Sequence, residues 1–407
     1  METQDPRRHG FDPARLARID RFLAQAYLEP GLLPCAQLVV ARDGVPVHVA
    51  SQGVHREGGG ALREDAIFRI ASMTKPVTSL AFMALVEQGR AALDMPVSAV
   101  VPELEAVEVH AGGGTASEPF RTVPPDRPML MLDLLRHTSG LTYDFQRVTP
   151  VDAAYRDAGL VALRGKTALE PFVAALGRIP LEFSPGAAWN YSVSTDVLAL
   201  VVQRLAGEPF DVHVQRTIFQ PLGMEDTSFT VPAAKAARLT DAWMLDAERG
   251  TIVYDRGADS SWLNPPAFLS GGGGLVSTLA DYHRFTRMLL GRGTLGDVRI
   301  VGRKTFDLMT VNHLPGGADL TELSRSMFSE AIYSGQGFGL GFGINMDPAK
   351  AMAPGSAGEF YWGGIFSTYF FVDPVERVSM VFMTQLMPSS SYPVRRQLKT
   401  IVYAALD

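Results

Sequence analysis

The feature that most constrains the fold is the placement of the β-type segments, which lie at the two ends of the chain. Near the N-terminus, residues 36–42 and 45–52 flank Asp43-Gly44, and Asp-Gly between two apolar runs is a strong hairpin signal. Near the C-terminus the β pattern returns at 338–346, 358–363, 367–373 and 377–386. This order predicts an α/β fold, with one antiparallel sheet flanked by helices and built from both chain ends, plus an inserted, mostly helical lobe.

The same pattern predicts where the two lobes divide. We expect residues 1–95 and 290–407 to form the α/β lobe, and residues 96–289 to form the helical and loop-rich lobe. Apolar spacing and boundary signals predict helices at 11–28, 73–89, 129–137, 190–206 and 393–405. Residues 105–128 hold three successive glycines and several prolines, so we expect a loop there.

Composition excludes several classes of function. The net charge is -6 and the 37 basic residues are spread along the chain, which predicts no nucleic-acid partner. No run approaches eighteen apolar residues and the N-terminus has no apolar signal segment, so we expect no membrane partner and a cytoplasmic location. Cys35 is the only cysteine, which leaves no internal disulfide. The eight histidines are scattered, so we expect no metal and no cofactor.

The first candidate for chemistry is the segment from Ser72 to Lys75, at the start of a predicted helix. Residues three apart share a helix face, so the Lys75 amine can reach the Ser72 hydroxyl. A serine needs such a base to become a nucleophile, and a lysine serves only if its pKa falls. Ser-x-x-Lys is expected by chance about once in a chain of this length. Alone, the motif therefore favours the simpler interpretation, an N-cap serine followed by a surface lysine.

Two later segments add candidates. Tyr191, just ahead of an apolar helix, is a credible general base when hydrogen-bonded to an amine, and otherwise a packed tyrosine at a helix start. Gly363 and Gly364 follow Trp362 in the C-terminal β region, where glycines mark close approach of a ligand or of another backbone. An exposed strand-edge N–H there can join the Ser72 N–H in an oxyanion hole. The alternative is a bulge beside a core tryptophan.

In this order, Ser72-x-x-Lys75, Tyr191-Ser192 and Trp362-Gly363-Gly364 resemble the family VIII carboxylesterases, close relatives of class C β-lactamases and DD-peptidases. Supporting matches lie at residues 134–141, 220–224 and 270–275, and the resemblance runs from about residue 15 to about residue 405. It implies a β-lactamase-like fold and a short list of site residues. These are Ser72 as the acylated nucleophile, Lys75 and Tyr191 as the base pair, the N–H groups of Ser72 and Ile365 as the oxyanion hole, and Trp362, Gly363, Gly364 and Tyr143 as substrate contacts.

Two departures from the β-lactamase pattern bear on the substrate. Trp362 stands where β-lactamases have the lysine of Lys-Thr-Gly, and Val193 stands where they have the asparagine of Tyr-x-Asn. The missing cation and amide disfavour anionic lactams and peptides, because Val193 offers neither donor nor acceptor. We therefore predict a serine carboxylesterase that hydrolyses small-molecule esters with short to medium acyl groups, with slow cephalosporin hydrolysis as a side activity.

Other functions stay open at this point. Similar Ser-x-x-Lys proteins are acyltransferases to small-molecule acceptors, β-lactamases, DD-peptidases, or non-catalytic penicillin sensors and scaffolds. An α/β-hydrolase is excluded because the chain has no Gly-x-Ser. Gly271–Gly274 is expected to be a tight structural turn, and His137 and His283 are expected to be packing or helix-end residues. The sequence leaves the physiological ester and the oligomeric state undetermined.

Overall fold

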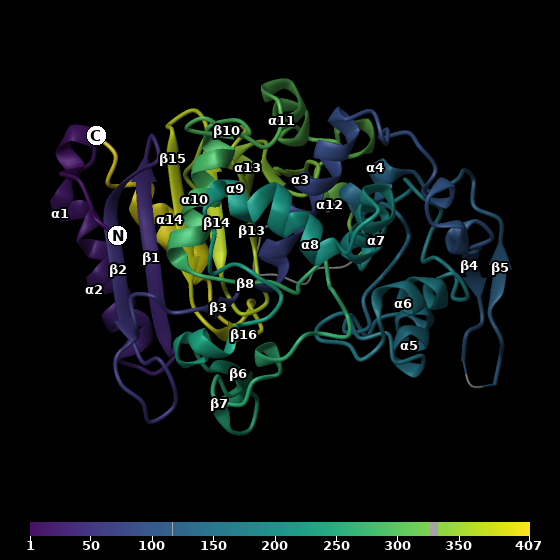
Figure 1. The fold of residues 1–407 in the computed structure, drawn as a ribbon, viewed down its shortest axis with the longest axis horizontal. Helices are drawn as coiled ribbons and strands as arrows, with labels where there is room; N and C mark the ends of the chain where they lie inside the picture. The colour runs from purple at the N-terminus through teal and green to yellow at the C-terminus, as the bar shows by residue number, and fades with distance from the viewer. Residues whose placement is uncertain (116, 326–332) are drawn as a thin grey trace.

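The structure, a computed structural model, describes residues 1–115, 117–325 and 333–407. Its centre is a seven-stranded sheet in the order β11-β12-β13-β14-β15-β1-β2, and every pairing in it is antiparallel (Figure 1). The strands are β1 (Cys35–Arg42), β2 (Val45–Gly53), β11 (Gln336–Phe338), β12 (Gly343–Asn345), β13 (Phe360–Gly363), β14 (Tyr369–Asp373) and β15 (Val378–Met383). Because β1 pairs with β15, the two chain ends form one sheet, which confirms the predicted fold class.

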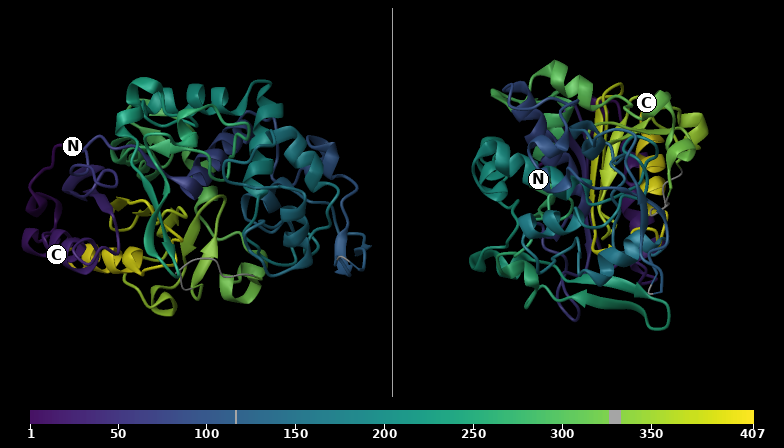
Figure 2. Two further views of the ribbon diagram at one scale, coloured as in Figure 1. Left: turned by 90° about the horizontal axis from the view of Figure 1, so that it is seen from below. Right: turned by 90° about the vertical axis from the view of Figure 1, so that its right-hand side faces the viewer.

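Both faces of the sheet are buried at β1, β14 and β15, which explains why these three strands are nearly continuous apolar runs. In β1, Leu38 and Val40 pack in one hydrophobic cluster, while Val39 between them packs in the other. The first cluster includes α1 (Pro13–Leu16), α2 (Arg18–Leu23) and α14 (Val394–Tyr403). On the opposite face, α10 (Leu279–Leu290) contacts β1, β14 and β15. Both termini therefore lie at the same end of the molecule (Figure 2).

The middle of the chain forms the helical part beside this sheet (Figure 1). Helix α3 (Thr74–Glu87) packs along α7 (Ser194–Ala206) and carries the candidate residues into this region. The other α-helices in the described residues are α4 (Met131–Leu135), α5 (Pro150–Asp157), α6 (Leu169–Leu176), α8 (Phe210–Val214), α9 (Gln220–Leu222), α11 (Arg303–Met309), α12 (Leu320–Leu323) and α13 (Pro348–Ala351).

Four small sheets complete the fold of the described residues, and one of them is a hairpin of β4 (Val109–Gly112) and β5 (Arg121–Val123). The pair β3 (Phe68–Arg69) and β8 (Val276–Ser277) brings the segment before Ser72 beside the glycine run that ends at Gly274. Another sheet joins β16 (Leu386–Met387), β6 (Ala242–Asp246) and β7 (Gly250–Asp255). A short hairpin is formed by β9 (Thr294–Leu295) and β10 (Val298–Arg299).

Several predicted boundaries were wrong for local reasons. The predicted loop at 105–128 contains a hairpin of β4 (Val109–Gly112) and β5 (Arg121–Val123). The predicted strand at 338–346 is two strands, because the chain turns through Gly341 with a φ of 95°. The strand predicted at 377–386 corresponds to β15, which ends at Met383. The chain then leaves the central sheet, and Leu386 begins β16 in another sheet. The helix predicted at 190–206 begins at Ser194, so Tyr191 lies in the turn before it.

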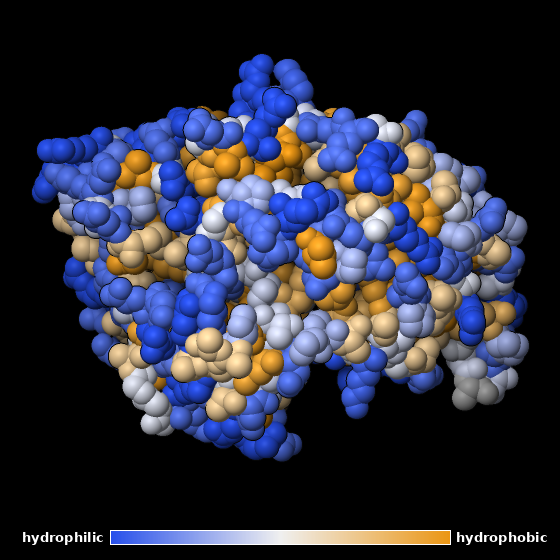
Figure 3. All heavy atoms as spheres, in the orientation of Figure 1, coloured by the Kyte–Doolittle hydropathy of each residue, from blue (hydrophilic) through white to orange (hydrophobic). Residues whose placement is uncertain are grey.

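The lobe boundaries remain a prediction, and the contacts of α10 with the sheet favour placing the second boundary before Leu279 rather than at residue 290. None of the helices in the described part of the chain is long and apolar enough to cross a membrane. Hydrophilic side chains cover much of the face shown in Figure 3, with apolar ones scattered between them.

Candidate active site

The segment that carries Ser72 makes an abrupt change from strand to helix. After β3, Ala71 adopts a φ of 43°, a left-handed conformation that is rare for alanine, and Ser72 lies in a single 3-10 turn before α3. The Ser72 N–H donates no hydrogen bond to any described residue, as expected for the first turn of a helix. The turn therefore presents both a hydroxyl and an unused backbone donor.

Arg69 holds this segment from behind. Its guanidinium is completely buried and donates to Asp255 Oδ2 at 2.7 Å and to Thr240 O at 2.8 Å. Gln385 binds the Arg69 backbone on both sides, accepting from its N–H at 3.1 Å and donating to its carbonyl at 3.0 Å. The nucleophile turn is thus anchored to β7 and to the segment after β15.

Lys75 lies directly behind Ser72, as the spacing predicts. Its Nζ is 3.2 Å from Ser72 Oγ and donates to Gly272 O at 2.7 Å. Burial lowers the pKa of Lys75 to about 7, and the nearby Asp196 carboxylate opposes that shift. A neutral amine that donates one N–H to Gly272 still has a lone pair for the Ser72 proton, so Lys75 meets the requirements of a general base near neutral pH.

Tyr191 completes a three-residue cluster with Ser72 and Lys75. Lys75 Nζ is 4.5 Å from the centre of the Tyr191 ring, and the hydroxyl interacts with the side chains of Ser72 and Trp362. Burial raises the pKa of Tyr191, while these two hydrogen bonds pull it down. The free protein therefore favours the protonated phenol, which can act as a hydrogen-bonding partner of Ser72.

Two residues beside Lys75 were missed in the sequence. Asp196, on the first turn of α7, is completely buried and its Oδ1 accepts from Ser270 Oγ at 2.6 Å and from Gly272 N–H at 2.9 Å. Burial raises the pKa of Asp196, and Lys75 lowers it. Gly272, expected only in a structural turn, thus connects the carboxylate to the amine. The available signal was a carboxylate inside the apolar run of α7, since buried aspartates are rare without a partner.

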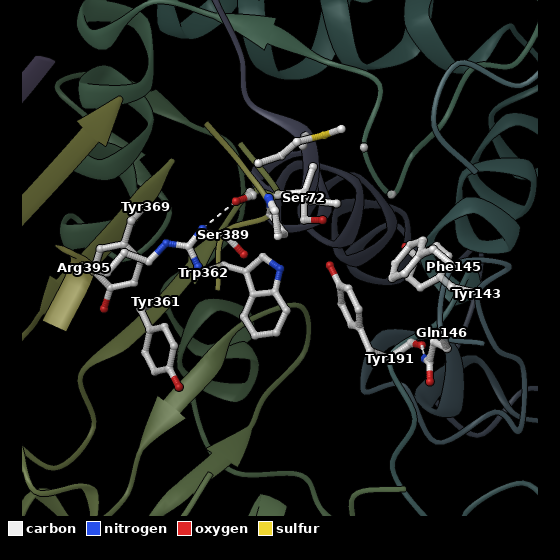
Figure 4. A pocket seen from close by; sticks show the side chains of 18 of the residues that line it. Ser72, Tyr143, Phe145, Gln146, Tyr191, Tyr361, Trp362, Tyr369, Ser389 and Arg395 are labelled. Carbon is white, nitrogen blue, oxygen red and sulfur yellow. Dashed lines mark hydrogen bonds between the residues drawn. The ribbon is translucent and has the colours of Figure 1, made fainter. Parts of the chain in front are cut away.

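The predicted substrate contacts share one cavity of about 680 Å³. Ser72, Tyr191, Trp362, Gly363, Gly364, Ile365 and Tyr143 all line it. The ring centres of Tyr191 and Trp362 are 5.6 Å apart, and the two side chains lie next to each other beside Ser72 in Figure 4. Tyr143 stacks on Phe145 at 4.6 Å and its ring centre is 5.5 Å from Lys75 Nζ. Aromatic side chains therefore form much of the wall around the nucleophile.

Gly364 brings the second predicted oxyanion donor close to the nucleophile segment. A Cβ at this position would lie 2.4 Å from Ile70 O, so only glycine permits the approach. The next residue, Ile365, has an N–H that donates to no described residue. Two unused amides, at Ser72 and Ile365, thus come from segments that are far apart in the chain and lie at one cavity.

The cavity is not free of cations, although Trp362 itself carries no charge. The lining includes Arg325 and, from α14, Arg395, Arg396 and Lys399. Lys399 is paired with the buried Glu359 at 2.6 Å, and Arg395 donates to the carbonyls of Gly364 and Thr368. Neither residue was found from the sequence, because nothing local relates the C-terminal helix to the site. Within the ranges the structure describes, no group of three metal-ligating side chains is found.

Comparisons with known proteins identify the fold and the family. The fold is that of β-lactamases and penicillin-binding proteins: a penicillin-binding protein homolog from Caulobacter crescentus superimposes with a TM-score of 0.69 over 98% of this chain and 99% of that one, at 21% identity. The β-lactamase family matches residues 22–404, and the chain belongs to this family. The family predicted from the sequence is thereby confirmed.

Individual members of the family resemble this chain over most of its length. Esterase EstB of Burkholderia gladioli is 32% identical over 418 residues, which cover 98% of each chain. Protein Rv1367c of Mycobacterium tuberculosis is 36% identical over 82% of this chain and 81% of its own length. Among solved structures, EstCE1, described as a hydrolase with promiscuous acyltransferase activity, has a TM-score of 0.80 and 25% identity over 96% of this chain and 99% of that one.

Proposed function

We propose that the protein is a serine carboxylesterase that acts through an acyl-enzyme on Ser72. The observation that carries this proposal is the contact between a buried amine of lowered pKa, Lys75 Nζ, and Ser72 Oγ at 3.2 Å. The relatives named as esterases support an ester as the substrate, and an enzyme of this class is what the sequence predicts. A panel of p-nitrophenyl esters with short and medium acyl chains, beside a cephalosporin, tests it.

The proposed reaction follows from the positions of these groups. Ser72 Oγ attacks the ester carbonyl while its proton passes to Lys75 Nζ, and the Tyr191 hydroxyl assists as the hydrogen-bonding partner of Ser72. The N–H groups of Ser72 and Ile365 stabilise the oxyanion. The C–O bond to the alcohol breaks, and the alkoxide takes the proton from Lys75. Water then attacks the acyl-enzyme, gives a proton to Lys75, and releases the acid; Ser72 Oγ recovers that proton.

We expect the activity to rise with pH. Lys75 must be neutral to accept the proton, and its pKa is lowered to about 7, so the protonated and inactive form dominates below pH 7. The value of kcat/KM should rise about tenfold per pH unit below 7 and level off above roughly pH 8. Initial rates measured from pH 5 to pH 9, with an ester whose spontaneous hydrolysis is slow over this range, check this expectation. A flat profile from pH 5 to pH 9 would contradict the assignment of Lys75 as the base.

We also expect kcat/KM for simple esters to be well above kcat/KM for β-lactams. Trp362 supplies no cation for the carboxylate of a lactam, and a charge-assisted hydrogen bond contributes about 1.5–3 kcal/mol, or roughly tenfold to a hundredfold in kcat/KM. Arg395 does not replace that cation in this scheme, because it is bound to two backbone carbonyls. Trp362→Lys should narrow the gap between ester and cephalosporin. Wild-type protein that hydrolyses penicillins or cephalosporins faster than any simple ester is a lactamase instead.

Acyl transfer is a second function that a specific observation favours. The cavity of about 680 Å³ is larger than a short acyl group needs, so an acceptor alcohol can bind while Ser72 is acylated. Several relatives support this, among them the acyltransferase calJ of Penicillium decumbens, 30% identical over 55% of this chain and 52% of that protein. Adding alcohols to the esterase assay and quantifying new esters by chromatography tests whether the acceptor is water or an alcohol.

A further inference from the structure

The turn between β13 and β14 carries the predicted oxyanion donor Ile365 and is closed by its own hydrogen bonds. Gly364 N–H donates to Thr368 O at 2.9 Å, and Ser367 N–H donates to Gly364 O at 3.0 Å. Ser367 has a φ of 67°, which is uncommon for a residue with a side chain. Such a turn needs support from its surroundings to keep one geometry.

Neighbouring segments provide that support on two sides. Ser367 Oγ donates to Leu386 O at 2.7 Å, and Leu386 N–H donates to Phe366 O at 3.2 Å, which ties the turn to β16. On the nucleophile side, Thr368 Oγ1 lies 3.4 Å from Ile70 O. These contacts set the distance between the turn and the Ser72 segment. On the Gly364–Ile365 peptide itself, the turn provides one donor, the Ser367 N–H.

Arg395 acts on that peptide. Its Nη2 donates to Gly364 O at 2.5 Å and to Thr368 O at 3.0 Å, so one charged group joins the two ends of the turn. The guanidinium also occupies the space that Gly363 leaves, since a Cβ there would lie 2.8 Å from Arg395 Cζ. Figure 4 shows Arg395 beside Trp362, with Tyr361 and Tyr369 close to it.

The Gly364 carbonyl and the Ile365 N–H belong to the same peptide unit. A trans peptide is planar, so its C=O and N–H point in opposite directions, and a donor that fixes the carbonyl also fixes the direction of the N–H. A cation on the carbonyl oxygen also polarises the unit, which strengthens the N–H as a donor. A charged group on one side of the peptide therefore acts on whatever binds on the other.

We infer that Arg395 is a positioning residue of the oxyanion hole, which aims and strengthens the Ile365 N–H toward the negative oxygen that develops on the substrate. The inference rests on the proposed acyl-enzyme at Ser72. It assigns to the C-terminal helix a part in transition-state stabilisation, and it explains why Gly363 and Gly364 occur together: the first makes room for Arg395 and the second for Ile70.

The test compares Arg395→Gln and Arg395→Ala with Arg377→Gln. Arg377 lies in the β14–β15 turn, is paired with Asp43 and is exposed, so it controls for the loss of an arginine. We expect Arg395→Gln to lower kcat about tenfold to a hundredfold with KM within twofold, somewhat less than the loss of an oxyanion donor itself. Added ethylguanidine should restore part of the activity of Arg395→Ala, and Arg377→Gln should match wild type throughout.

A boronic acid that forms a tetrahedral adduct on Ser72 separates this inference from the proposed function. Its affinity, measured by calorimetry, should fall in Arg395→Gln by the same factor as kcat, and the measurement needs no ester turnover. If kcat and boronate affinity both stay within twofold of wild type, Arg395 has no such role. A rise in KM confined to esters that carry a carboxylate would show instead that Arg395 binds the substrate. Loss of activity with a lowered melting temperature and no rescue would show a structural role only.

Discussion

Ser72→Ala is expected to lower ester hydrolysis roughly 10⁴- to 10⁶-fold, the range seen when a nucleophile is removed from a serine hydrolase. The side chain supplies the atom that becomes acylated, and neither Lys75 nor Tyr191 can replace it as an oxygen nucleophile held beside both unused amides. The substitution removes one hydroxyl at the edge of a cavity, so the melting temperature should stay near that of wild type. Initial rates with p-nitrophenyl butyrate and a thermal melt check both parts.

The labelling pattern gives an independent measure of the same assignment. A phosphonate or sulfonyl fluoride should add once per chain, and peptide mass spectrometry should place the adduct on Ser72. Ser117→Ala is the matched control, since Ser117 is exposed on the loop between β4 and β5, and it should keep full activity and full labelling. An adduct on any other serine, together with activity that survives in Ser72→Ala, would show that Ser72 is not the nucleophile.

Lys75→Ala is expected to lower kcat by about 10²- to 10⁴-fold with little change in KM, because general-base catalysis contributes in that range. Lys75→Arg should be as inactive as Lys75→Ala at every pH, because a guanidinium does not give up its proton. This variant keeps the positive charge beside Asp196. Tyr191→Phe should also lower kcat by orders of magnitude, because its hydroxyl interacts with Ser72. Steady-state kinetics from pH 5 to pH 9 measure all three.

A matched control tests whether the loss of a lysine elsewhere on the protein affects the kinetics. Lys304→Ala removes an exposed lysine of α11 and should leave the kinetics unchanged. Because Lys75→Ala leaves the buried Asp196 without its neighbouring amine, its fold must be checked by circular dichroism before its kinetics are interpreted. A correctly folded Lys75→Ala or Tyr191→Phe with wild-type kcat would remove that residue from the proposed mechanism.

Much of the architecture could be predicted because it depends on local patterns. The hairpin at Asp43-Gly44 follows from turn chemistry, and the strands β1, β14 and β15 follow from apolar runs of the right length. The errors fall where tertiary contacts override such patterns. Gly341 breaks a predicted strand because the chain turns beside Ser79, where a Cβ would lie 2.3 Å from the Ser79 hydroxyl. Nothing within a few residues of Gly341 records that contact.

The site divides in the same way. By itself, the sequence determined that Lys75 can reach Ser72 if a helix forms there, because three residues along a helix return to the same face, and only the order of the motifs together predicted the family. Only the tertiary structure decided the rest. Asp196, Gly272 and Arg395 reach the site from parts of the chain more than a hundred residues from Ser72, through packing that no local period encodes. The pKa of Lys75 likewise depends on burial among those distant segments, since desolvation is a property of the folded surroundings and not of the neighbouring residues in the chain.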